Sequence, residues 1–373
     1  MSLVLLTHGA AGSIEPQPLL EGLAFPTNMA VLPDGGLVFT EKETGSVRIV
    51  TADGELRRRA LTTVAVSPGA ERGLLGIAVH PEFEREPWIY LYLSDPSDGL
   101  NRLVRVRTDG AVATGQPETL LVGLSAAAGY HNGGDMVFAP DGTLFVALGD
   151  AHESERSQDR DDIGGKILRL EADGDVPPGN PFGPGNPVWS VGHRNSFGLC
   201  VDPATGELWE TENGPDVDDE VNLIEEGANH GWPVVTGRAA DERFVDPIAV
   251  FPSPIALTGC AVVDGELWFG SFDGRLWRLA RGQDRPREVA RFPAGVTDVV
   301  LGPDRQLLVA TADAIWTVDL SAQEGAPSPG AERGNPWRLP ATIALLAVVG
   351  VALAVRLVAG RRLDPGGRAD RIA

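Results

Sequence analysis

Positive charge is scarce in this chain of 373 residues, which has 31 Lys and Arg residues against 52 Asp and Glu residues and a formal net charge of −21. Lysine is especially rare, because only Lys42 and Lys166 occur. The phosphates of a nucleic acid would repel such an acidic chain, so the composition argues against nucleic-acid binding. The same excess of carboxylates favours a highly soluble, exposed domain.

Cysteine is equally rare, and Cys200 and Cys260 are each placed in an apolar run. Cysteines in such runs are usually buried small hydrophobic residues. A disulfide between the two is the alternative. Because neither interpretation is excluded, the cysteines do not identify the cellular compartment.

No long amphipathic helical pattern precedes the C-terminal region, whereas 46 Gly and 29 Pro residues make turns frequent. A short β-rich run, a Pro/Asp/Gly turn and a second β-rich run recur instead, which is the pattern of a β-hairpin. The six repeats of this pattern begin at Asn28, Gly76, Asp135, Gly198, Gly259 and Asp298.

Most of these hairpins are followed by a third strand pattern in which apolar and basic residues alternate. This pattern occurs at residues 46–50, 103–107, 166–170 and 275–279. Repeats that are spaced tens of residues apart, with several strands in each, are typical of propeller blades. We therefore predict an all-β fold, a six-bladed β-propeller with four-stranded blades, over residues 15–320. Six matching turns disfavour the alternative, an irregular β-sandwich.

The C-terminal region differs in composition from the rest. Residues 321–338 are rich in Pro, Gly, Ala and Ser and predict a flexible linker. Residues 339–360 form an apolar stretch close to the ~20 residues that a transmembrane helix needs. The arginine-rich tail, residues 361–373, is predicted to be cytoplasmic, which places the propeller outside the cell membrane. A helix buried in a protein core is the alternative for the apolar stretch.

An exported propeller needs an export signal, and the N-terminal region offers only the short apolar run Leu3–Leu6, with no basic segment before it. Either the true start lies further upstream or the C-terminal helix is inserted after synthesis. The sequence leaves both routes open.

Residues 192–233 contain the densest group of polar motifs in the chain. Here the turn residues Gly214 and Pro215 precede a group of acids, Asp216, Asp218, Asp219 and Glu220. A turn that exposes backbone carbonyls beside clustered carboxylates suits a hard cation such as calcium. Arg194, further upstream, could face an anionic ligand. The alternative is an acidic surface loop with ordinary turn residues.

Polar residues immediately precede the predicted first strand in three of the six repeats. These are residues 130–132, residues 193–195 and Thr258. Residues at the same position in successive blades converge around the axis of a propeller. We therefore expect His131 and Arg194 to lie close together, facing that axis.

Several motifs follow one another in order along residues 15–320. They include G-L-L-G-I-A-V-H-P-E-F from Gly73, H-N-G-G-D-M from His131, G-G-K-I-L-R-L from Gly164, E-N-G-P from Glu212 and G-A-N-H-G-W-P from Gly227. In this order they resemble the glucose/sorbosone dehydrogenase family. The resemblance implies a six-bladed propeller that oxidises aldose sugars with pyrroloquinoline quinone (PQQ) and calcium. The same family fold also occurs in animal Hedgehog-binding proteins, which are not known as enzymes, so the fold alone does not determine the activity.

The resemblance also implies roles for residues at matching positions. His131 matches the base that takes the proton from the C1 hydroxyl of the sugar while hydride moves to the quinone. Arg194 matches the arginine near the quinone oxygens, where positive charge stabilises the reduced form. The other residues that match cofactor contacts are Asn195, Asn213, Asp219 and Thr258.

Two cation sites are implied in the same way. The carbonyls of Gly214 and Pro215 match those that hold the calcium beside the cofactor, where the ion acts as a Lewis acid. Glu220 and the backbone of His230 match a second, structural cation site. His230 stands where a tyrosine is common in the family, and a ligand from the backbone tolerates that change.

The chain departs from the family at the residues that clamp the cofactor in blades five and six, which are basic in the best-studied type. The corresponding segments, 271–274 and 295–298, contain no basic residue, although Arg275 is adjacent. Tyr130 also stands where that type has an acid. Because a charged hydrogen bond is commonly worth about 1.5–3 kcal/mol, these changes predict weaker binding of PQQ.

Three functions are compatible with these patterns. The first is a membrane-anchored, extracytoplasmic enzyme that oxidises aldoses at C1 to lactones with PQQ and calcium, which the motifs around His131 favour. The second is a non-enzymatic, calcium-stabilised propeller that binds a glycan or a protein, which the missing basic clamp favours. The third is a sugar-lactone hydrolase that needs no quinone.

Overall fold

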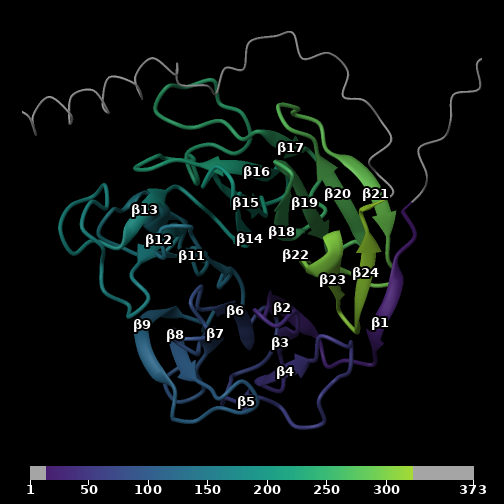
Figure 1. The fold of residues 1–373 in the computed structure, drawn as a ribbon. Coiled ribbons are helices and arrows are strands. Elements are labelled where there is room, and N and C mark those ends of the chain that lie inside the picture. The colour runs from purple at the N-terminus through teal and green to yellow at the C-terminus, as the bar shows by residue number, and fades with distance from the viewer. Residues whose placement is uncertain (1–13, 322–373) are drawn as a thin grey trace, which may run out of the picture. The chain divides into compact units, whose positions relative to one another are not determined.

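The computed structural model describes residues 14–321, which form six antiparallel sheets of four strands each, arranged as a ring (Figure 1). The predicted six-bladed propeller with four-stranded blades is confirmed. Each hairpin repeat supplies the first two strands of one blade. The alternating patterns at residues 46–50, 103–107, 166–170 and 275–279 all fall within third strands.

The blades follow one another in chain order around the ring. Blade one is β2 (Pro26–Val31), β3 (Leu37–Glu41), β4 (Ser46–Val50) and β5 (Thr62–Thr63). Blade two is β6 (Leu74–Val79), β7 (Trp88–Ser94), β8 (Leu100–Arg107) and β9 (Glu118–Ser125). Blade three is β10 (Met136–Phe138), β11 (Leu144–Leu148), β12 (Lys166–Leu170) and β13 (Val188–Val191).

The second half of the ring repeats this arrangement. Blade four is β14 (Ser196–Val201), β15 (Leu208–Glu212), β16 (Asp219–Ile224) and β17 (Ala249–Phe251). Blade five is β18 (Leu257–Val263), β19 (Glu266–Ser271), β20 (Arg275–Leu279) and β21 (Arg287–Arg291). Blade six is β22 (Val296–Leu301), β23 (Gln306–Thr311), β24 (Ala314–Asp319) and β1 (Gln17–Glu21). Two short 3-10 turns, η1 (Ser154–Gln158) and η2 (Pro303–Arg305), lie in connections within blades three and six.

The ring is closed by the N-terminal strand, which the sequence patterns did not predict. β1 pairs antiparallel with β24, with Gln17 opposite Thr317 and Glu21 opposite Ala314. The outer edge of the last blade is therefore covered by the first strand of the domain. Closure of this kind keeps the first and last blades together and protects a strand edge that would otherwise be exposed.

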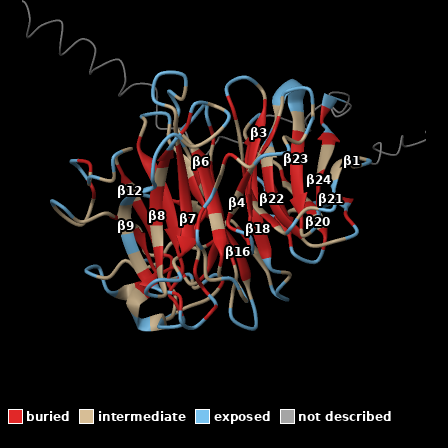
Figure 2. Cartoon of the chain, turned by 90° about the horizontal axis from the view of Figure 1, so that it is seen from below, coloured by how far each residue is buried: buried red, intermediate tan, exposed pale blue. Residues whose placement is uncertain are grey.

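The core consists of six hydrophobic clusters, and each cluster lies between two neighbouring blades. Second strands such as β3 and β11 are buried along their whole length, because each blade is covered on both faces. This explains their nearly continuous apolar sequences. Outer strands such as β9 and β21 mix exposed and buried residues. Figure 2 shows the buried strands in the middle of the ring and the exposed loops around them.

The polar residues that begin three of the repeats link the innermost strands of the blades to one another. Each accepts a hydrogen bond of 2.7 Å from a backbone N–H group of another blade. The pairs are Asn28 with Ile77, Asp135 with Leu199, and Asp298 with Met29. Inner strands have no partner strand on the axial side, so these side chains satisfy N–H groups that would otherwise be buried without an acceptor.

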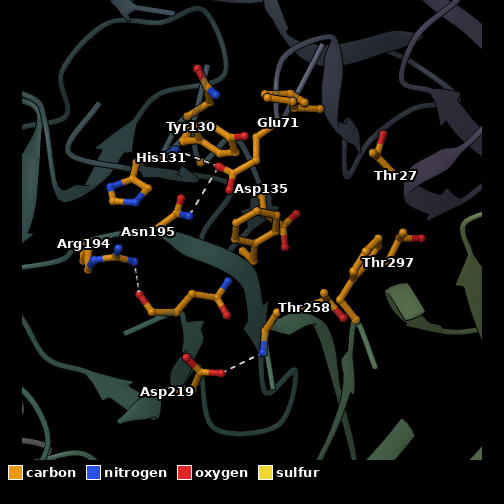
Figure 3. Close-up of a pocket in the computed structure, with 18 of the residues that line it drawn as sticks. Thr27, Glu71, Tyr130, His131, Asp135, Arg194, Asn195, Asp219, Thr258 and Thr297 are labelled. Carbon is orange, nitrogen blue, oxygen red and sulfur yellow. Dashed lines mark hydrogen bonds between the residues drawn. The ribbon is translucent and has the colours of Figure 1, made fainter. Parts of the chain in front are cut away.

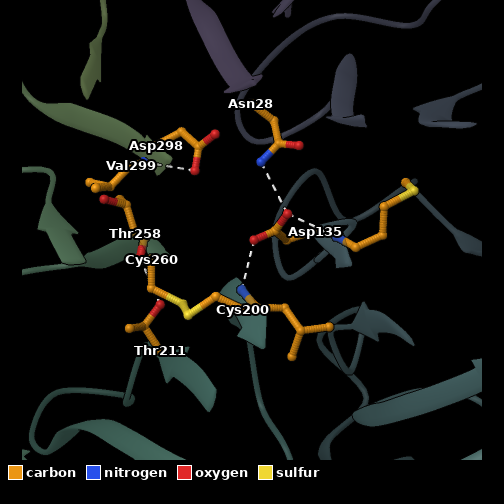
Figure 4. The surroundings of a disulfide bond; sticks show 10 residues. Asn28, Asp135, Cys200, Thr211, Thr258, Cys260, Asp298 and Val299 are labelled. Carbon is orange, nitrogen blue, oxygen red and sulfur yellow. Dashed lines mark hydrogen bonds between the residues drawn. A yellow bond between two sulfur atoms is a disulfide. The ribbon is translucent and has the colours of Figure 1, made fainter. Parts of the chain in front are cut away.

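Asp135 and Asp298 are both buried at the centre of the ring (Figure 4). Burial raises the pKa of Asp135 to about 6. Burial, together with the nearby charge of Asp135, also raises the pKa of Asp298. The glycine that begins the fifth repeat is required by the same crowding, because a Cβ on Gly259 would lie 1.9 Å from Oδ1 of Asp298.

A disulfide joins Cys200 of β14 to Cys260 of β18, which are the innermost strands of blades four and five (Figure 4). The sequence left open whether these cysteines are bonded, and the structure shows that they are. Both residues are 6% exposed and belong to the cluster between the two blades. They are therefore buried as well as bonded, and the bond links two adjacent blades close to Thr258.

Most of the predicted linker, and all of the predicted transmembrane helix and basic tail, lie outside the described residues. Within residues 14–321, no helix is long and apolar enough to span a membrane. Membrane anchoring through residues 339–360 therefore stays a prediction.

Candidate active site

A cavity of about 590 Å³ opens at the axis, where the blades meet (Figure 3). Every blade contributes to its wall near the start of its first strand, and the contributing residues include Thr27, Leu75, His131, Arg194, Thr258 and Thr297. The predicted convergence of equivalent residues is therefore found. His131 and Arg194 line the same cavity, together with Asn195, Asn213, Gly214, Pro215 and Asp219.

His131 is held in place by a buried carboxylate. Its Nδ1 lies 2.6 Å from Oδ1 of Asp150, and Oδ2 of Asp150 accepts a hydrogen bond of 2.8 Å from the indole of Trp232. Burial opposes the ionisation of Asp150, but hydrogen bonds from His131 and Trp232 outweigh it and hold the pKa of the carboxyl below its usual range. An ionised Asp150 keeps the proton on Nδ1, so that Nε2 of His131 is the nitrogen that can accept a proton.

The backbone around His131 is strained. His131 has a φ of 56°, and Ala151 and His152 have φ values of 53° and 64°. Non-glycine residues rarely adopt this left-handed region, and such strain gathers at functional sites. The backbone N–H of His131 donates to Glu71 at 2.7 Å, and the ring of His152 lies 4.0 Å from that of His131. Both contacts limit the orientations that His131 can take.

Asp150 is a candidate functional residue that the sequence analysis did not identify. It follows the fully buried strand β11 by one glycine, on the loop that leads to η1. An acid at the end of a buried strand is a weak signal by itself. Only the meeting of that loop with residues 130–132 shows that Asp150 contacts the imidazole of His131.

Arg194 stands on the opposite side of the ring from blade one, with its guanidinium only partly satisfied. One Nη donates to the carbonyl of Asn213 at 2.8 Å, and the guanidinium carbon lies 5.4 Å from the centre of the Trp232 ring. Within residues 14–321, the buried Nε has no hydrogen-bond partner. The backbone N–H of Arg194 donates to the carboxylate of Glu212. Arg194 is thus anchored while retaining an unsatisfied donor beside the cavity.

Five buried polar atoms on residues that line the cavity lack a hydrogen-bond partner among the described residues. They are Nδ2 of Asn132, Nε of Arg194, Oδ1 of Asn195, Oδ1 of Asn213 and Oγ1 of Thr258. An unsatisfied buried polar group is destabilising, so proteins rarely keep several in one place. The mixture of donors and acceptors fits a polar ligand, and it fits the quinone, carboxylate and ring nitrogen groups of PQQ.

Asp219 shapes the wall of the cavity through the backbone. Its Oδ1 accepts from the N–H of Gly214 at 2.9 Å, and its Oδ2 accepts from Ile255 and Ala256 at 2.7 and 2.8 Å. Burial raises the pKa of this carboxyl. Asp219 was predicted to contact the cofactor, and in the structure it also fixes the turn of Gly214 against the segment that enters blade five.

The residues predicted for two separate cation sites all line a second, smaller cavity of about 10 Å³ next to the first. Gly214 and Pro215 line both cavities, whereas Glu220 and His230 line only the smaller one. This volume is close to that of one water-sized sphere. Glu220 and His230 therefore lie around a space that suits a single ion, and Gly214 and Pro215 stand between that space and the large cavity.

The small cavity is lined by three acids, Glu212, Asp218 and Glu220, and by one cation, Arg194, so acidic residues predominate. Glu212 shares its lining with Glu220, and burial together with the charge of Glu212 raises the pKa of Glu220 to about 8. Burial also raises the pKa of Glu212. Two carboxylates forced together in a buried space repel each other, and a divalent cation relieves that repulsion. The residues present therefore fit calcium.

The sequence analysis considered only the backbone of His230, but its imidazole ring is also buried beside the small cavity. It is 5% exposed, and neither ring nitrogen has a hydrogen-bond partner within the described chain. Burial and the neighbouring His193 lower its pKa to about 3, so the ring is neutral. His193 itself pairs with Glu210 at 3.0 Å, and despite its burial this carboxylate raises the pKa of His193 to about 10.

Blades five and six depart from the family pattern at residues that do not all line the large cavity. Phe272 and Thr297 line the large cavity, whereas Asp273 does not. Asp273 accepts a hydrogen bond from Oγ of Ser271 at 2.6 Å and pairs with Arg275. The wall contributed by these two blades therefore lacks a cation, as the sequence indicated, but it also lacks the carboxylate of Asp273.

By fold and site, the molecule is a β-propeller with a cavity at its axis and an adjoining small cavity lined by acidic residues. Residues 23–313 match the family described as Glucose / Sorbosone dehydrogenase, and the chain belongs to that family.

Known relatives agree with this assignment. An uncharacterized protein of Synechocystis, slr1608, is 34% identical over 348 residues, which cover 80% of this chain and 84% of that protein. The aldose sugar dehydrogenase YliI of Escherichia coli is 31% identical over 242 residues, which cover 61% of this chain and 64% of that protein. Among solved structures, a PQQ-bound aldose sugar dehydrogenase of Streptomyces coelicolor has a TM-score of 0.76 at 32% identity, over 83% of this chain and 99% of that one.

Proposed function

We propose that this protein oxidises aldose sugars at C1 to lactones, with PQQ as the electron acceptor in its axial cavity. The pairing of His131 with the ionised Asp150 carries the proposal, because it places an oriented base in a cavity lined by unsatisfied polar atoms. The relatives support it, since one is an aldose sugar dehydrogenase and one such enzyme has been solved with PQQ bound.

Each residue of the site has a separate role in the proposed reaction. Nε2 of His131 takes the proton of the C1 hydroxyl, and Asp150 stabilises the imidazolium that results. PQQ, when bound, supplies the acceptor for the hydride that leaves C1. Arg194 places a positive charge beside the cavity, where it stabilises the negative charge that accumulates during the transfer. Asn195, Asn213 and Thr258 offer hydrogen bonds that would orient the cofactor and the sugar in the cavity.

Reconstitution tests this proposal. The purified propeller is incubated with PQQ and calcium, and reduction of an artificial dye is followed with a panel of aldoses, while the lactone is identified by mass spectrometry. We expect dye reduction that requires both PQQ and an aldose. The proposal is wrong if no aldose gives a rate above that of protein without PQQ.

We also propose two calcium sites. The carbonyls of Gly214 and Pro215 hold one ion beside the cofactor, and the carboxylate of Glu220 and the carbonyl of His230 hold a second ion in the small cavity. Glu220→Gln should abolish the stabilisation that the second ion confers, because it removes the charged ligand and keeps the shape. A 100-fold excess of calcium over its Kd at that site would stabilise the wild type by about 2.7 kcal/mol. Melting temperatures with and without calcium measure this difference.

The control for that experiment is Asp216→Asn, since Asp216 is an exposed acid in the same turn. It should respond to calcium like the wild type. In calcium-free buffer, Glu220→Gln should be at least as stable as the wild type, because it removes a buried carboxyl with a raised pKa. An equal calcium response in wild type and Glu220→Gln would contradict the assignment.

We further propose that the propeller lies outside the cell membrane, anchored by residues 339–360. The bond between Cys200 and Cys260 supports an oxidising location, because disulfides persist mainly outside the cytosol. Cells are quenched with acid, and the free thiols of the denatured protein are then alkylated and identified by mass analysis, because both cysteines are buried in the folded domain. We expect unmodified Cys200 and Cys260, and alkylation of both residues would contradict an extracytoplasmic location.

A calcium-stabilised propeller that binds a glycan without catalysis is the second candidate. The uncharged wall formed by Phe272 and Thr297 favours it, since that wall offers no cation to a polyanionic cofactor. Calorimetric titration separates the two candidates. Micromolar binding of PQQ favours the dehydrogenase, and calcium binding without PQQ binding favours the glycan-binding propeller.

A further inference from the structure

Lys42 places a buried ammonium group at the wall of the axial cavity. The residue lies in the turn after β3 and is 5% exposed. Its Nζ donates to the carbonyls of Ala70 and Arg72 at 3.0 and 3.4 Å. Its ion pair in the described chain is with Glu43 at 3.5 Å, whose side chain is 60% exposed. The ammonium also lies 4.9 Å from the centre of the Phe25 ring.

This arrangement leaves the charge of Lys42 poorly compensated. A long contact with a solvated carboxylate contributes little, and a buried cation is normally paired. The face of Phe25 offsets part of the lost hydration. Glu71 also lines the cavity, but its Oε2 accepts from the backbone of His131 and, at 3.4 Å, from Asn195. Lys42 therefore lines a cavity in which no described carboxylate forms an ion pair with its ammonium group.

The ring order puts Lys42 opposite Arg194. Lys42 belongs to blade one, and Arg194 directly precedes β14 of blade four. Contacts between consecutive blades, and between blades six and one, close the ring, so these two blades are three steps apart in either direction. Lys42 and Arg194 thus stand on opposite walls of one cavity of about 590 Å³.

The walls that blades five and six contribute offer no second cation beside Lys42. Thr297 uses its hydroxyl to donate to the carbonyl of Pro26 at 2.7 Å, and Phe272 packs its ring 6.3 Å from that of Phe25. The cation that blades five and six lack is therefore present one blade further around the ring. Two cations on opposite walls, with aromatic rings beside one of them, match a flat ligand that carries anionic groups at both ends.

We propose that Lys42 binds a carboxylate of the ligand in the axial cavity, at the wall opposite Arg194. The proposal deepens the proposed function, on which it rests, by assigning an anion-binding residue to blade one. A carboxylate can reach Lys42 from two sources, the PQQ cofactor or an acidic sugar such as a uronic acid.

Binding to the calcium-loaded protein tests the proposal without any assay of activity. Isothermal titration gives the Kd for PQQ at low and high salt, and the Kd for glucuronate and glucose. We expect Lys42→Met to weaken the binding of PQQ or of glucuronate at least tenfold and to reduce its salt dependence. Lys42→Arg, which keeps the charge, should weaken binding less than Lys42→Met does.

The matched control is Arg85→Met, which removes the same charge from a side chain that is 74% exposed on a blade-two loop. It should bind both ligands like the wild type. The melting temperature of ligand-free Lys42→Met should stay close to that of the wild type, because the loss of a buried charge is offset by the loss of the hydrogen bonds to Ala70 and Arg72. If this variant fails to fold, Lys42→Gln, which can still donate to the Ala70 carbonyl, takes its place.

The outcomes separate this proposal from the proposed function. Unchanged binding of PQQ and of glucuronate by the Lys42 variant overturns the proposal even if the wild type binds PQQ tightly. If the wild type binds no PQQ, the proposed function fails. Only the Kd for glucuronate then tests whether Lys42 binds an anion. Loss of glucuronate binding in the variant then supports an anion site, and unchanged or absent binding overturns it.

Discussion

Replacing His131 with asparagine should lower the kcat for aldose oxidation by about a thousandfold, within the 10²–10⁴ range of general-base catalysis. Asparagine is suitable because it tolerates the left-handed backbone that His131 adopts at a φ of 56°. The variant should therefore fold and bind PQQ like the wild type while lacking a nitrogen basic enough to take the proton. Steady-state dye reduction at saturating PQQ and calcium measures the effect.

Two further variants sharpen the test. Asp150→Asn should also lower kcat strongly, because an amide no longer fixes the proton on Nδ1 of His131. His80→Gln is the control, since His80 packs against Tyr90 and Phe138 between blades two and three and does not line the cavity. If His131→Asn keeps more than a tenth of the wild-type kcat, His131 is not the base.

Removing the disulfide with the double change Cys200→Ala and Cys260→Ala should lower the free energy of unfolding by about 2–4 kcal/mol. The bond closes a loop of 60 residues between the innermost strands of two blades, so it restricts the unfolded chain considerably. Alanine leaves no buried polar group at either position. Chemical denaturation in the presence of calcium measures the loss.

Wild-type protein treated with a reductant provides an independent comparison. It should lose about the same stability as the alanine pair, because the same cross-link is absent. The reductant should have no effect on the double variant itself. Equal stability of oxidised and reduced wild type would show that the bond contributes nothing to the fold.

Much of the fold can be predicted from short stretches of sequence. The six repeats and the four alternating third-strand patterns each depend on residues close together in the chain, and all lie in the blades as predicted. The residues that begin the repeats also make contacts between blades, which the hairpin pattern alone does not indicate. Asn28, Asp135 and Asp298 link blades through their side chains, and Gly259 gives room to Asp298.

The site was predictable where one segment carries several of its residues. The turn from Gly214 to Glu220 and the residues around Arg194 all belong to blade four, and the structure places them together beside two cavities. Their chemical roles remain proposals. Asp150 and Lys42 escaped prediction because neither stands in a polar motif, and their importance depends on residues from other segments.

The sequence alone determined the number of blades, the family and the residues that face the axis, because periodicity and motif order are local properties of the chain. Only the tertiary structure decided how the ring closes through β1, that Cys200 and Cys260 are bonded, and which carboxylate orients His131. It also showed that the cation opposite Arg194 comes from blade one. Closing a ring brings together residues that are far apart in the chain, and no local pattern specifies which of them will meet.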